Sequence, residues 1–168
     1  MGPLRGLLAV DDRHALEFFF ISLKDVCDVA VDPQELLYNA SVLAHYAQVS
    51  THSDTDIPAP ADLGAVFDQF VVNTTLPLDG ALMEMAGAQC LLLTGFFEDQ
   101  MRGRHNIRWY SELGASFFSR AAGRQDSAHK ARLLTMLARR FEPWRRRHAR
   151  LSRELRDQAY LLAPPRVM

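Results

Sequence analysis

Apolar side chains recur every three or four residues along most of this 168-residue chain. That spacing places them on one face of an α-helix. Runs that alternate apolar and polar residues, as half-buried strands do, are almost absent. The sequence therefore predicts an all-α fold. In the predicted helix 13–29, the buried stripe consists of Leu16, Phe19, Phe20, Leu23 and Cys27.

Start and stop signals divide the chain into a bundle of about six or seven helices. Asp32 followed by Pro33 is a strong start signal, because the carboxylate caps free N–H groups and proline suits the first helical position. The segment 50–60 is acidic and contains prolines, which predicts a flexible surface loop. The length suits a single domain spanning 1–168. After the helix that begins at Asp32, we expect helices over 63–70, 80–94, 106–123, 127–141 and 143–162.

The helix 80–94 carries apolar residues around nearly its whole circumference, which predicts that it lies at the centre of the bundle. In the helix 106–123, Gly114 falls within the apolar stripe. Glycine costs about 1 kcal/mol relative to alanine inside a helix. We therefore expect another helix to cross closely at Gly114.

Charge is divided unequally along the chain. Residues 1–101 contain three Lys or Arg against fifteen Asp or Glu, a net −12, whereas residues 102–168 have a net +11. The whole chain is nevertheless almost neutral, at −1. Such a division favours association between surfaces of opposite charge.

The predicted basic helical pair 127–162 holds the candidate partner- or anion-binding residues. Three interpretations of this cluster remain open. It could pack against the acidic part of the chain or of another subunit, bind an anionic protein, or contact nucleic-acid phosphates. The expected binding residues are Arg139, Arg140, Trp144, Arg145, Arg146, Arg147, Arg150 and Arg153.

The motif Thr94-Gly95-Phe96-Phe97, after a leucine-rich run, precedes Trp109-Tyr110 and Phe117-Phe118 at fixed spacing. With upstream matches in 16–47, this pattern resembles a group of uncharacterised bacterial proteins that carry Gly-Phe-Phe and then Tyr-Tyr-x-x-x-Gly-x-x-Ala-Tyr. The present chain departs from it at Trp109 and at Phe117-Phe118, so tyrosine hydroxyls are not required at those places. The resemblance implies an all-helical cytoplasmic protein from a bacterium, and it implies no activity.

Patterns typical of catalysis are missing from the sequence. There is no Glu-x-x-His pair for a di-iron site, no Gly-x-Ser-x-Gly elbow and no phosphate-binding glycine loop. We therefore predict no catalytic residue, metal or cofactor. Glu84 is the polar residue of interest on the central helix, either solvated, paired with an arginine such as Arg108 or Arg120, or part of a ligand pocket. Tyr38 and His45 share one helix face and are the other candidate pocket residues.

The apolar run at the N-terminus is too short for a secretory signal, and the run 81–97 is too short to span a membrane. Cys27 and Cys90 lack metal-binding spacing and are expected to be reduced, buried thiols. We therefore expect a cytoplasmic, non-enzymatic interaction or regulatory protein with a protein partner or self-association and no membrane contact. Nucleic-acid association through the Arg-rich last helix, and a small helical ligand-binding protein or enzyme with a pocket near Glu84, are the alternatives.

Overall fold

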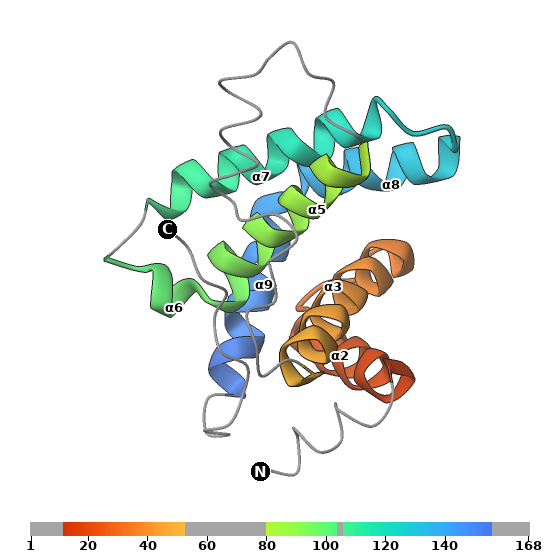
Figure 1. Ribbon diagram of the computed structural model, residues 1–168. Coiled ribbons are helices and arrows are strands. Elements are labelled where there is room, and N and C mark those ends of the chain that lie inside the picture. The colour runs from red at the N-terminus through yellow and green to blue at the C-terminus, as the bar shows by residue number, and fades with distance from the viewer. Residues whose placement is uncertain (1–11, 53–79, 104–105, 156–168) are drawn as a thin grey trace.

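The computed structural model describes residues 12–52, 80–103 and 106–155, and these residues form an all-α fold without strands (Figure 1). The first two helices, α2 (Asp12–Val26) and α3 (Pro33–His52), pack against each other. Asp32 caps α3 as predicted, because its Oδ1 accepts a hydrogen bond from the N–H of Gln34 at 2.7 Å. The apolar face of α3 is buried, at Leu36, Ala40, Leu43 and Ala47. Of the stripe predicted for the first helix, Phe19 and Leu23 are buried, whereas Leu16, Phe20 and Cys27 are half-buried and pack against the core.

Two helix ends differ from the predictions. The first helix stops at Val26, three residues earlier than expected. The second continues to His52, so residues 50–52 are helical and the predicted loop 50–60 does not begin at residue 50. The rest of that loop, the predicted helix 63–70 and the end of the predicted helix 143–162 lie outside the described residues.

The apolar helix predicted over 80–94 is an α-helix only at its beginning. After α5 (Gly80–Leu91), the chain widens into a π-helical turn, η1 (Leu92–Phe96). The short helix α6 (Glu98–Met101) follows, in a stretch between two predicted helices. Every residue of η1 is buried, which agrees with the predicted central position of this segment.

The next two helices are α7 (Ile107–Ala122) and α8 (Ala128–Arg139), which pack side by side. Each is capped at its N-terminus by a side chain. The Oδ1 of Asn106 accepts a hydrogen bond from the N–H of Trp109 at 3.1 Å, and Ser127 caps α8 in the same way. Gly114 of α7 confirms the predicted close crossing, because a Cβ atom there would lie 2.7 Å from the Cβ of Cys90.

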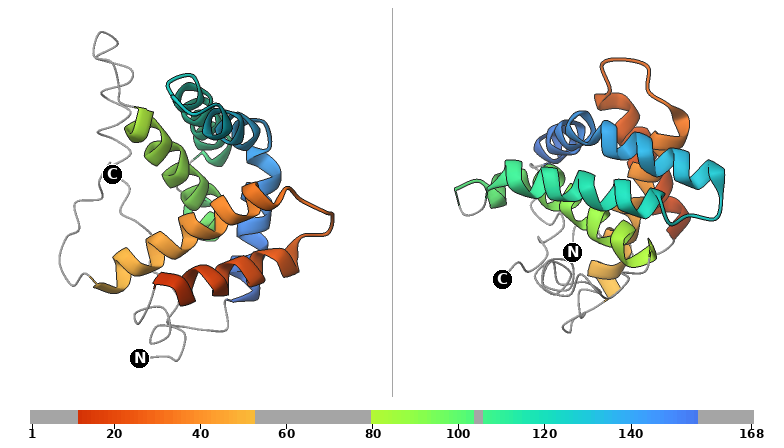
Figure 2. Two further views of the ribbon diagram at one scale, coloured as in Figure 1. Left: turned by 90° about the vertical axis from the view of Figure 1, so that its right-hand side faces the viewer. Right: turned by 90° about the horizontal axis from the view of Figure 1, so that it is seen from above.

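The last described helix, α9 (Phe141–Glu154), connects the two parts of the bundle. It packs on η1 and α7 on one side and on α2 on the other. Figure 2 shows α9 running between the α2–α3 pair and the group formed by α5, α7 and α8. The large apolar side chains of α9 are buried, namely Phe141, Trp144 and Leu151. The side chains on α9 are therefore placed to contact segments distant in sequence.

Candidate functional site

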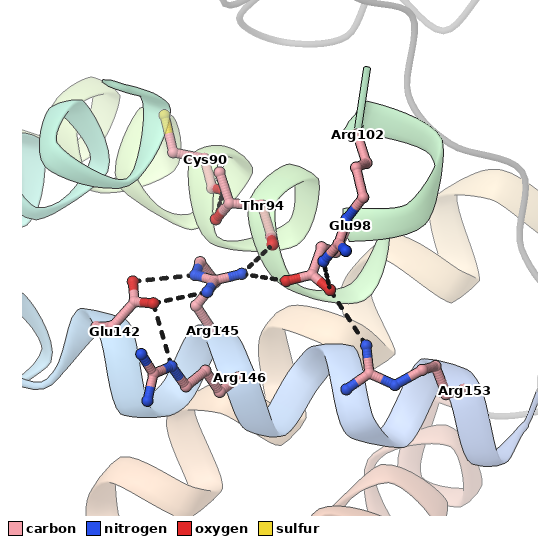
Figure 3. Close-up of polar contacts among 8 residues, drawn as sticks. All are labelled: Cys90, Thr94, Glu98, Arg102, Glu142, Arg145, Arg146 and Arg153. Carbon is pink, nitrogen blue, oxygen red and sulfur yellow. Dashed lines mark hydrogen bonds and ion pairs between the residues drawn. The ribbon is translucent and has the colours of Figure 1, made fainter. Parts of the chain in front are cut away.

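Arg145 extends from α9 into the junction of η1 and α6, as Figure 3 shows. Only 9% of this arginine is exposed. Its guanidinium donates to both carboxylate oxygens of Glu142, at 3.0 and 2.6 Å, and to the Glu98 carboxylate. It also donates to the main-chain oxygen of Thr94 at 3.1 Å. A buried charge needs such partners to offset the loss of its water shell.

The π-helical turn helps to explain why Thr94 can accept this bond. Its wider turn is closed by the N–H of Phe97, which donates to the carbonyl of Leu92 at 2.9 Å. Such a turn interrupts the regular α-helical bonding, so carbonyls there can bond to other groups. Gly95 lets α9 approach, because a Cβ on it would lie 2.7 Å from the Cβ of His148 and 2.9 Å from the Arg145 carbonyl oxygen.

Glu98 pairs with three arginines, two on α9 and one directly after α6. In addition to Arg145, its Oε1 accepts from Arg102 at 3.0 Å and from Arg153 at 3.1 Å. Burial disfavours the charged form of Glu98, but the hydrogen bond and charge of Arg145, together with Arg102, outweigh it and lower the pKa of the carboxyl. The pKa of Glu142 is lowered as well, chiefly by its hydrogen bond from Arg145.

A second polar cluster joins α9 to α3. The side chain of Glu35 is 3% exposed. Its carboxylate forms an ion pair with Arg140 and accepts a hydrogen bond from the indole N–H of Trp144 at 3.0 Å. One turn further, Asn39 Oδ1 lies 2.8 Å from His148 Nε2. The amide nitrogen of Asn39 already donates to the Glu35 carbonyl, so His148 Nε2 is the donor. His148 Nδ1 is a buried acceptor that has no hydrogen-bond partner among the residues the structure describes. Burial lowers the pKa of His148 to about 3.

The structure thus shows how the predicted binding arginines are used. Arg140, Arg145, Arg150 and Arg153 form ion pairs with acidic residues from the first 101 residues of the chain. Arg146 pairs with Glu142 on its own helix. Arg147 lies 4.6 Å from the ring centre of Trp144, and Trp144 itself is buried. Most of the arginine charges on the last helix are thus paired with acids of the same molecule, which is the arrangement that the first of the three interpretations describes.

Free cationic groups lie instead on α8 and at its start. Arg132 and Arg139 are exposed, and neither makes an ion pair with another described residue. Between them lies Met136, which is half-buried and does not pack on the described core. Positions 132, 136 and 139 share one helix face. We call Arg132, Met136 and Arg139 the α8 stripe; Arg124, also exposed and unpaired among the described residues, lies before α8.

Sequence reasoning named Arg139 but missed Arg132 and Met136. The available signal was that residues 128–139 contain no acidic residue, which leaves α8 without local neutralisation. Glu35, Asn39, Thr94 and Glu98 were missed as well. No local spacing could have found them, since the partners in α9 are about fifty to a hundred residues away in sequence, such as 47 residues for Glu98 and Arg145.

The predicted pocket residues are only partly brought together. The carboxylate of Glu84 accepts a hydrogen bond from the hydroxyl of Tyr38 at 2.7 Å. It also lies 3.2 Å from the ammonium group of Lys130. Burial raises the pKa of Tyr38, and the Glu84 carboxylate raises it further. Arg108, one suggested partner of Glu84, pairs with Glu112 instead. His45 is exposed on α3 and makes no hydrogen bond or ion pair with Tyr38 or Glu84.

Both cysteines are free thiols, Cys27 partly buried and Cys90 fully buried. Burial raises the pKa of the Cys90 thiol, so that it remains protonated. Within the described residues, no three His, Cys, Asp or Glu side chains are grouped to hold a metal ion. No described helix is long and apolar enough to cross a membrane.

Comparison with known proteins adds no relative: no protein-family model, curated protein or solved structure matches this chain.

Proposed function

We propose that this protein is a non-enzymatic interaction protein of the adaptor or regulatory kind, and that it binds an acidic protein surface through the α8 stripe. The observation that carries the proposal is the contrast between two basic helices. The arginines of α9 are largely paired with acids of the same molecule, whereas Arg132 and Arg139 of α8 are exposed and unpaired among the described residues.

A protein surface fits the α8 stripe better than nucleic acid does. Met136 lies between the two arginines, and a partner with an apolar residue between two acids would cover it. A nucleic-acid backbone offers charge but no such apolar group. Moreover, α8 has no aromatic side chain on which a base could stack. We propose in addition that the protein acts in the cytoplasm.

The test uses a helical peptide with two glutamates seven residues apart and a leucine between them. Fluorescence anisotropy at 50 and 300 mM salt should show binding that weakens at the higher salt concentration, since ion pairs at a surface are screened. R132E/R139E should lose binding, whereas R108E, which changes an exposed arginine on α7, should keep it. Failure of the wild-type protein to bind at low salt would refute the proposal. Tighter binding to a DNA duplex of equal length would favour the nucleic-acid function instead.

A further inference from the structure

The outer face of α2 carries a stripe whose charges are opposite to those of the α8 stripe. Ile21 is 59% exposed, although it is a large apolar residue. Glu17 lies one turn before it and Asp25 one turn after it, both exposed. Glu17 is 4.0 Å from Arg13 in a surface pair, and Asp25 makes no ion pair with another described residue. We call Glu17, Ile21 and Asp25 the α2 stripe.

The two stripes match in length as well as in charge. A helix rises 1.5 Å per residue, so Glu17 and Asp25 are separated by about 12 Å along α2, and Arg132 and Arg139 by about 10.5 Å along α8. Each stripe has an apolar residue between its two charges. When the stripes face each other, each acid can meet an arginine while Ile21 covers Met136.

One molecule cannot bring its own two stripes together. In Figure 1, α3 lies between α2 and α8, and α3 contacts both helices. The contact therefore requires two molecules. Lys24 is also exposed beside Ile21 and reduces the negative charge of α2, so the contact depends on two ion pairs and one apolar contact.

We propose that the acidic surface bound by the α8 stripe is the α2 stripe of a second copy of this chain. The inference rests on the proposed function, because it uses the same arginines. Each copy carries one stripe of each kind, so it can make the contact with two neighbours, one through each stripe. Burying Ile21 against Met136 removes apolar surface from water, and the two ion pairs of each contact set the orientation.

Light scattering at 50 and 500 mM salt tests the inference. The wild-type protein should show a mass well above the 19.0 kDa of one chain at low salt, and a lower mass at high salt. R132E/R139E makes both stripes acidic, and E17K/D25K makes both basic. Each variant alone should be a monomer because its stripes repel. An equimolar mixture of the two should associate again, since every contact then joins an acidic stripe to a basic one.

R124E is the matched control, since it reverses an exposed arginine outside the stripe and should leave the mass unchanged. The substituted positions are exposed, and circular dichroism would verify that each variant is folded. A wild-type monomer at every salt concentration overturns the inference, as does a mixture that fails to associate. If the acidic peptide nevertheless binds the wild-type protein, the proposed function stands with a different partner; if neither association occurs, both proposals fail.

Discussion

Arg145 is the side chain on which the polar junction of η1, α6 and α9 depends. It is the one arginine of this junction that is buried, while Arg102 and Arg153 are 69% and 50% exposed at the side chain. Removing it leaves Glu98 charged, buried and paired only with solvent-screened arginines. Loss of one member of a buried pair is costly because the other keeps its desolvation penalty.

We therefore expect R145M to lower the free energy of unfolding by about 3 kcal/mol. R146M is the matched control on the same helix, since Arg146 is 74% exposed and also pairs with Glu142. R146M should change the free energy of unfolding by no more than about 0.5 kcal/mol. Urea unfolding followed by circular dichroism measures both. Adding E98Q to R145M should recover part of the loss, and equal losses in R145M and R146M would contradict this account.

His148 makes stability depend on pH. Its pKa is about 3 in the folded protein, below its ordinary value of 6.5, because burial disfavours the charged ring. The unfolded chain therefore binds more protons between these values, and stability falls as pH drops below about 6.5. From pH 7.5 to 5.5, His148 should account for a loss of about 1.4 kcal/mol.

The measurement compares urea unfolding at the two pH values for the wild-type protein, H148Q and H129Q. H148Q should lose most of this dependence, although it is less stable at both pH values. H129Q alters an exposed histidine and should keep the dependence. An unchanged pH dependence in H148Q would show that another group is responsible.

At the scale of elements, the close approach of α9 to η1 depends on Gly95. A methyl group there would meet the main chain of Arg145 and the Cβ of His148, neither of which can rotate away. G95A should therefore lower the free energy of unfolding by about 1–3 kcal/mol.

Gly123, at the end of α7, has φ −68° and ψ −11°, and a Cβ there would have ordinary contacts. G123A should stabilise by about 0.5 kcal/mol, since alanine reduces the freedom of the unfolded chain. Thermal and urea unfolding of both variants would measure these changes in stability, which should be a decrease for G95A and an increase for G123A.

The elements also show what the sequence could predict. The helix caps at Asp32 and Asn106 and the crossing at Gly114 were predictable, because each depends on residues whose local preferences are strong. The change from α- to π-helix at Leu92 was not, since an apolar run has the same appearance in both. The α9 arginines were recognised as a group, but their partners depend on how distant helices cross. That information is absent from local spacing.

At the scale of the whole molecule, α9 ties the α2–α3 pair to the helices α5, α7 and α8. Its contacts include Trp144 with Glu35, His148 with Asn39, and Arg150 with the carbonyl of Val26. Ion pairs of Arg140 with Glu35, Arg145 with Glu98 and Arg150 with Asp28 add to these contacts, so that cations of the second part of the chain meet acids of the first. The described part of the bundle should therefore unfold as one unit.

The fluorescence of Trp144 can test whether the described part of the bundle unfolds cooperatively. Trp144 is 1% exposed, whereas Trp109 is 41% exposed, so W109F removes the more exposed of the chain's two tryptophans. In W109F, the fluorescence of Trp144 and the circular dichroism at 222 nm should change at the same urea concentration. A fluorescence transition at lower urea than the loss of helix would show that α9 detaches first.

The π-helical turn also fixes the rotational phase of everything that follows it in the segment 92–101. In a regular helix each residue turns the chain by 100°. If Leu92–Phe96 formed an unbroken α-helix of the same length, its narrower turns would swing Glu98 roughly a quarter of a turn further around the axis and away from Arg145. A locally more regular helix would thus give the less stable protein, because the carboxylate and the guanidinium would no longer face each other.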